Sequence, residues 1–89
     1  MPLQILGATG DQVTDDIRTC IEAAIEGAEV EVSAGGAGHF EIRVTSASFA
    51  GESRVKQQQR VYAAIAHLMK GETAPVHAID KLQIVVPEG

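Results

Sequence analysis

The spacing of apolar residues changes several times along the chain, and each change marks a new element. Between Asp11 and Gly27 the apolar positions recur every three or four residues, which is the helical period. Aspartates in the first turns suit the positive end of the helix dipole, and Gly27 is a typical helix stop. This segment is therefore predicted to be one helix with a single buried stripe. The stripe consists of Val13, Ile17, Cys20, Ile21 and Ala24.

From residue 28 the apolar spacing falls to two, which is the period of a half-buried strand. The alternating positions are Val30 and Val32, followed by Phe40, Ile42 and Val44. The glycine-rich residues 33–39 between them are predicted to be a flexible loop that joins the two strands as a hairpin. Residues 35–38 match Gly-x-x-Gly by letter, but no helix follows them, so a phosphate site is not expected there.

A second helix is predicted after Ser53, whose side chain can cap the first free amide groups. Its apolar positions are Val55, Tyr62, Ile65 and Met69, with Val61 and Leu68 beside them. Gly71 and Pro75 then end the helix and lead into a last strand over 76–86.

The alternation in this last strand is broken, because Ile79 differs in parity from the apolar residues after it. One extra residue, held as a bulge near Asp80 and Lys81, would restore a single buried face. His77 is predicted to be exposed where the strand starts, because its neighbours have the opposite parity and would face the helices. Ile79 shares the parity of His77. A buried Ile79 would therefore draw the histidine inward, unless the strand begins after His77.

The order helix, strand, strand, helix, strand predicts an α+β domain with a three-stranded mixed sheet. The hairpin makes the first two strands antiparallel, and a right-handed crossover makes the second and third parallel. Both helices are expected to cover the same face. The chain is divided into an N-terminal extension over 1–10, the folded domain over 11–86 and a C-terminal tail over 87–89.

The composition indicates one small domain in a reducing compartment. The chain has 89 residues, of which 45% are hydrophobic, enough for a single two-layer core. Its net charge of -5 opposes general binding to nucleic acid, which depends on phosphate neutralisation. Cys20 is the only cysteine, so no internal disulfide can form, and we expect it to be buried in the core. Without a membrane-spanning run or a basic signal region, the expected location is the cytoplasm.

The candidate chemistry rests on histidines. No set of nucleophile, base and orienting residue is evident, so an enzyme is not expected. His39 and His77 stand at loop–strand junctions that the predicted fold can bring together, whereas His67 is expected at the surface of the second helix. Two imidazoles supply half of the roughly four protein ligands that zinc or an iron–sulfur cluster commonly takes. The spacing leaves open whether a partner completes this set or the two are ordinary surface histidines.

A basic patch lies on the polar face of the second helix, where Arg54, Lys56 and Arg60 occur with no acidic residue among them. The patch is either a local contact for nucleic acid or a solvated helix face. Three cations would give a slope of log affinity against log salt of about -2.7, at about -0.9 per phosphate. Binding through this patch alone would therefore be weak at physiological salt.

Several separated motifs resemble the BolA family. They are Phe49-x-Gly51-x-Ser53-Arg54, Gln58-Gln59-x-Val61-Tyr62 and Val76-His77-Ala78, and the loop ending in His39-Phe40 resembles the acid-stress-associated bacterial branch. The resemblance covers roughly residues 14–84 and implies a class II KH-like fold. The sequence departs from the family at Asp80-Lys81-Leu82 and at its last four residues.

The resemblance also implies a partner and a cofactor. BolA proteins pair with monothiol glutaredoxins and share a 2Fe-2S cluster, for iron–sulfur trafficking or for iron and stress sensing. By position, His77 would be the family's invariant histidine ligand and His39 its variable loop ligand. A glutaredoxin cysteine and a glutathione thiolate would complete the set, so a monomer that forms a heterodimer with glutaredoxin is expected. The alternative is a KH-like transcriptional regulator that binds DNA weakly through Arg54, Lys56 and Arg60.

Overall fold

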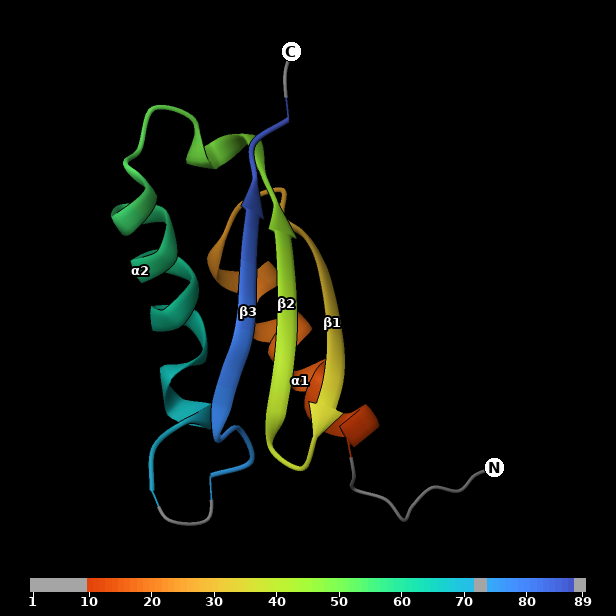
Figure 1. Ribbon diagram of the computed structural model, residues 1–89. Helices are drawn as coiled ribbons and strands as arrows, with labels where there is room; N and C mark the ends of the chain where they lie inside the picture. The colour runs from red at the N-terminus through yellow and green to blue at the C-terminus, as the bar shows by residue number, and fades with distance from the viewer. Residues whose placement is uncertain (1–9, 72–73, 88–89) are drawn as a thin grey trace.

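The structure is a computed structural model that describes residues 10–71 and 74–87. Its elements are α1 (Gly10–Ala24), β1 (Glu29–Gly36), β2 (His39–Thr45), the 3-10 turn η1 (Ala47–Phe49), α2 (Arg54–Ile65), the 3-10 turn η2 (Ala66–Leu68) and β3 (Ala78–Val85). The strands form one sheet in the order β1–β2–β3, and both helices lie on the same face of it (Figure 1). β1 and β2 are antiparallel, and β2 and β3 are parallel. These features confirm the predicted α+β fold class and strand directions.

The β1–β2 hairpin is tighter than predicted. β1 continues to Gly36 and β2 begins at His39, so the turn between them is only two residues long. Ala34 pairs with Phe40 and Gly36 pairs with His39, which leaves Gly35 as the extra residue of a bulge. The prediction of a flexible loop over 33–39 is therefore wrong. Glycine has a low strand propensity, but backbone pairing across a bulge needs no side chain.

β3 carries the bulge that its broken alternation predicted. Phe40 pairs with Ile79 and Glu41 pairs with Lys81, so Asp80 is the extra residue. The apolar residues on both sides of the bulge consequently pack against the core. They are Ile79, Leu82 and Ile84.

The core lies between the sheet and the two helices. Its buried apolar side chains are Ile17, Ile21, Ile25, Val30, Phe40, Ile42, Val44, Phe49, Val61, Ile65 and Val76. In and just after α1 the buried residues are four positions apart, at Ile17, Ile21 and Ile25. Two residues of the predicted stripe do not belong to this row. Ala24 is exposed, and Cys20 is only partly buried at the edge of the core. The prediction that Cys20 is a buried core residue therefore needs this correction.

α2 buries only part of the predicted stripe. Ser53 caps the helix as expected, because its side chain accepts a hydrogen bond from the amide three residues later. Val61 and Ile65 are buried, whereas Val55 is 62% exposed and Tyr62 is 38% exposed. The helix therefore uses mainly its second half to cover the sheet, and its first turns remain largely in solvent.

Parts of the predicted domain division lie outside the described residues. The N-terminal extension over 1–10 is described only at Gly10, and the tail over 87–89 is described only at Pro87. The break after the second helix is described except at 72–73. Within the described ranges, no helix is long and apolar enough to cross a membrane.

Candidate functional site

The fold brings His39 and His77 to the same end of the sheet. His39 is the first residue of β2, and His77 directly precedes the first residue of β3. The register pairs His39 with Ala78, so the two histidines start neighbouring strands. The backbone N–H groups of His77 and Ala78 both donate to the Gly38 carbonyl, at 2.8 and 3.1 Å. The sequence prediction that the fold unites these two histidines is therefore confirmed.

Gly38 is the residue on which this arrangement depends. Its φ is +75°, in the left-handed region that favours glycine. A Cβ at this position would lie only 2.6 Å from Cδ2 of His77. The imidazole of His77 therefore packs on the bare backbone of the turn. Glycines often mark places where two parts of a chain come very close together. From the sequence, the glycines of residues 33–39 were nevertheless explained only by a flexible loop.

His77 is exposed, as predicted, while the residues around it face the core. Val76 is 1% exposed, and Ile79 packs against the buried cluster. His77 precedes the first residue of β3, so the strict alternation of a strand does not apply to it. Val76 and Ile79 can therefore both point inward while His77 points outward. A hollow of about 210 Å³ adjoins the imidazole. It is lined by Met69, Gly71, Ala74, Val76 and His77.

His39 is also exposed, and its ring has a defined partner. Its Nδ1 lies 3.0 Å from Oδ1 of Asp80, the bulge residue of β3. Each of the two side chains is 48% exposed. This contact occupies Nδ1 and leaves Nε2 open to solvent or to a ligand. Nothing in the sequence pairs these two residues, because they meet only through the parallel register.

Two imidazoles at one edge fit part of a metal site and no more. Among the described residues, no group of three or more His, Cys, Asp or Glu side chains could hold a metal ion. A 2Fe-2S cluster takes four ligands, and histidines replace two of the cysteines in some such centres. By themselves, His39 and His77 therefore supply at most half of such a ligand set.

The predicted nucleic-acid patch is divided by the structure. Arg60 donates to Glu52 at 2.8 Å and to the Ser48 carbonyl at 3.2 Å, and its guanidinium lies 4.9 Å from the centre of the Phe49 ring. Arg60 thus ties the middle of α2 to η1 and to the segment that precedes the helix. Among the described residues, Arg54 and Lys56 have no ion pair, and both are exposed.

One further contact escaped sequence reasoning. The Sγ of Cys20 lies 3.5 Å from Nε2 of His67, which joins α1 to η2. His67 is exposed, as predicted. The two residues are 47 positions apart, so only the packing of the helices reveals the pair.

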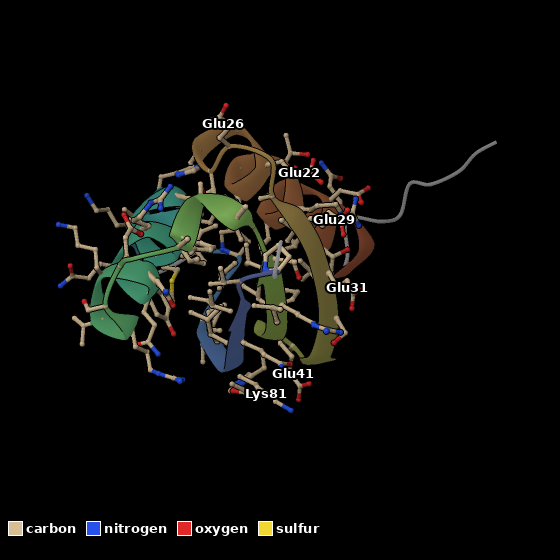
Figure 2. All side chains as sticks on the ribbon, turned by 90° about the horizontal axis from the view of Figure 1, so that it is seen from above. Glu22, Glu26, Glu29, Glu31, Glu41 and Lys81 are labelled. Carbon is tan, nitrogen blue, oxygen red and sulfur yellow. The ribbon has the colours of Figure 1, made fainter. Side chains whose placement is uncertain are left out.

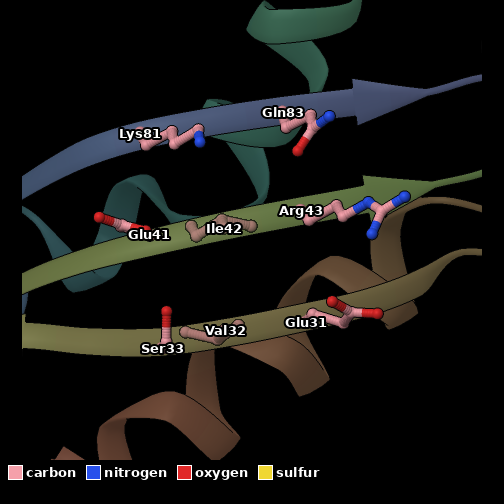
Figure 3. A pocket seen from close by; sticks show the side chains of 8 residues that line it. All are labelled: Glu31, Val32, Ser33, Glu41, Ile42, Arg43, Lys81 and Gln83. Carbon is pink, nitrogen blue, oxygen red and sulfur yellow. The ribbon is translucent and has the colours of Figure 1, made fainter.

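The remaining charges are distributed unevenly. Acidic side chains gather on the flank formed by α1 and β1, and Glu22, Glu26, Glu29 and Glu31 mark it in Figure 2. The face of the sheet away from the helices carries mixed charges over a depression of about 330 Å³ (Figure 3). One row across it is Glu31, Arg43 and Gln83, and the next is Ser33, Glu41 and Lys81. Opposite charges stand side by side in each row, which is typical of a solvated sheet face.

Comparison with known proteins identifies the fold and the family. A solved structure of mouse BolA1 (Mus musculus) is 27% identical, with a TM-score of 0.66 over 98% of this chain and 76% of that one. A BolA homologue from Coxiella burnetii is 26% identical, with a TM-score of 0.63 over 81% and 88% of the two chains. BolA1 from Arabidopsis thaliana, at 21% identity, shares the fold with a TM-score of 0.66 over 85% and 94%.

Curated protein sequences give no significant match. The family model described as "BolA-like protein" matches residues 20–87, which is most of the chain and includes both histidines. The chain therefore belongs to the BolA-like family.

Proposed function

We propose that this BolA-like chain is a partner of a monothiol glutaredoxin and shares a 2Fe-2S cluster with it, for iron–sulfur trafficking or for iron and stress sensing. The observation that carries the proposal is that two exposed histidines both adjoin the Gly38 turn. His39 follows Gly38 in the chain, and the ring of His77 packs on it. A ligand that is shared with another protein has to reach the surface, and both imidazoles do.

The ligand count supports a shared centre in place of a resident one. His39 and His77 would hold one side of the cluster, and thiolates from the glutaredoxin and from glutathione would hold the other. The hollow beside His77 gives the partner room to approach this ligand. The chain alone would then carry no cluster and would be monomeric.

The cluster, when bound, supplies one-electron chemistry or serves as the cargo that is transferred. The contribution of this chain is two neutral ligands. Replacing thiolates by imidazoles lowers the negative charge on the iron and raises the reduction potential. Handover to this chain would therefore change the visible spectrum of the cluster.

The proposal is tested by mixing the protein with cluster-loaded monothiol glutaredoxin. We expect a change in the visible circular dichroism spectrum and a heterodimer on size-exclusion chromatography. His77→Ala should abolish both signals, and His39→Ala should weaken them. His67→Ala is the matched control, because this third histidine is exposed but contacts Cys20 in place of the Gly38 turn. A His77→Ala variant that behaves like the wild type would refute the proposal.

A further inference from the structure

We infer that Asp80 is a positioning residue for His39: it holds the ring through Nδ1 and so presents Nε2 as the atom that binds iron. The identity of the bound group rests on the proposed function. The tautomer that Asp80 imposes does not, and it can be measured in the free protein.

The hydrogen bond fixes which nitrogen carries the proton. Nδ1 of His39 lies 3.0 Å from Oδ1 of Asp80. An ionised carboxylate can only accept a hydrogen bond, so Nδ1 of the neutral ring must donate. Nε2 then keeps its lone pair. A carboxylate in this position is one of the common partners by which proteins orient a histidine that ligates a metal.

The bulge in β3 is what frees Asp80 for this contact. In a regular ladder Asp80 would stand opposite Glu41, placing two acidic side chains together. The bulge puts Lys81 opposite Glu41 in its place. Two like charges are thereby replaced by an opposite pair. Asp80 turns instead toward His39, which lies two residues before Glu41 on β2.

A second bulge lies on the other side of the same histidine. A Cβ on Gly35, the bulged residue of β1, would lie 3.8 Å from Oδ2 of Asp80 and 3.9 Å from the His39 carbonyl oxygen. The carboxylate of Asp80 therefore extends from β3 across the first residue of β2 toward β1. His39 stands between two irregular strand ends that together define where its ring lies.

The alternative is an ordinary surface ion pair. Both side chains are 48% exposed, and pairs in such surroundings contribute little to stability. A pair of this kind would leave the ligand affinity of His39 unchanged. The two readings therefore differ in measurable ways.

The first measurement uses the metal-free, ¹⁵N-labelled protein and needs no partner. Long-range ¹H–¹⁵N NMR at alkaline pH, where the rings are neutral, reports which nitrogen of His39 is protonated. We expect Nδ1–H in the wild type and a shift toward Nε2–H in Asp80→Ala. Asp16→Ala, at an exposed position of α1, should leave His39 unchanged, and Asp80→Ala should not alter the tautomer of His77. A wild-type His39 that carries its proton on Nε2, or a tautomer insensitive to Asp80→Ala, would overturn the inference.

The second measurement uses cluster-loaded monothiol glutaredoxin. Asp80→Ala should weaken the complex about 10–100-fold, the usual effect of removing such an orienting group. In a His39→Ala background it should cause no further loss. Asp80→Asn keeps the side-chain shape and an amide oxygen that can still accept from Nδ1–H, so it should fold like the wild type and weaken the complex less than Asp80→Ala does. Equal losses from Asp80→Ala with and without His39 would show that Asp80 does not act through this ring.

The two measurements separate failure of the inference from failure of the proposed function. If the His77→Ala variant forms the same complex as the wild type, the shared cluster of the proposed function is refuted. The role of Asp80 in iron binding would fall with it, and the NMR result would still decide the tautomer.

Discussion

The imidazole of His77 lies against the backbone of Gly38, so closely that a Cβ on the glycine would come 2.6 Å from Cδ2 and 2.8 Å from Cγ of the ring. The Gly38 carbonyl also accepts the N–H of His77 at 2.8 Å. Turn and histidine fit together only if residue 38 has no side chain. The glycine-rich turn therefore serves the candidate site by bringing one histidine to the other.

Gly38→Ala should both destabilise the protein and displace His77. The substitution combines a φ of +75° with the clash against the ring, so we expect a loss of about 1–3 kcal/mol in the free energy of unfolding. Urea denaturation measures the loss, and NMR shifts of the His77 ring report its movement. Gly36→Ala is the matched control, because a Cβ there meets nothing within 4 Å. Equal effects of the two substitutions would show that Gly38 is not the platform for His77.

The buried stripe of α2 predicts unequal costs for two apolar residues of one helix. Ile65→Ala should lower the free energy of unfolding by about 2–5 kcal/mol, because it leaves a cavity in the core. Val55→Ala should change it by less than about 0.5 kcal/mol, because Val55 is 62% exposed. Thermal and urea unfolding of the two variants would measure both. Equal costs for the two variants would instead support the stripe predicted from the sequence, which includes both residues.

Arg60 is expected to act in stability and not in ligand binding. Arg60→Ala removes the ion pair with Glu52, the contact with the Phe49 ring and the bond to the Ser48 carbonyl. The guanidinium is partly exposed, so the expected loss in free energy of unfolding is about 1–2 kcal/mol. Arg54→Ala, at an exposed position without an ion pair, should cost less than about 0.5 kcal/mol. Equal melting temperatures for both variants would contradict this assignment.

Binding to DNA should be weak and governed by two cations. With Arg60 engaged, Arg54 and Lys56 remain, and about -0.9 per phosphate gives a slope of log affinity against log salt of about -1.8. Fluorescence anisotropy with a labelled duplex at several salt concentrations measures this slope. A tight complex with one sequence that resists salt would instead make nucleic-acid binding the main activity.

Much of the fold follows from local patterns in the sequence. Periods of 3.6 and two mark the helices and strands, and Ser53 marks the start of α2. The bulge at Asp80 could be predicted because strand parity has a period of two, so one extra residue is visible as a shift of every later apolar position. Parity alone left the exposure of His77 open, because Ile79 has the same parity and packs against the core.

The remainder depends on how the elements pack. The predicted stripe of α2 included Val55 and Tyr62, which are exposed. Only the orientation of the helix on the sheet shows that Val61 is buried beside Ile65 in their place. The contact between His39 and Asp80 depends on the parallel register and on the bulge together. Such pairs join residues far apart in the chain, so the local spacing of apolar residues does not predict them.

The most direct test of the account is whether the two histidines are bonded to iron. The reduced cluster is paramagnetic, so pulsed electron paramagnetic resonance detects magnetic nuclei of its ligands. The measurement uses the heterodimer in which only this chain carries ¹⁵N-histidine. We predict ¹⁵N couplings from two imidazoles in the wild type, one of them lost in His39→Ala and both retained in His67→Ala, while His77→Ala should give no loaded complex. A loaded complex without any ¹⁵N coupling from this chain would contradict it.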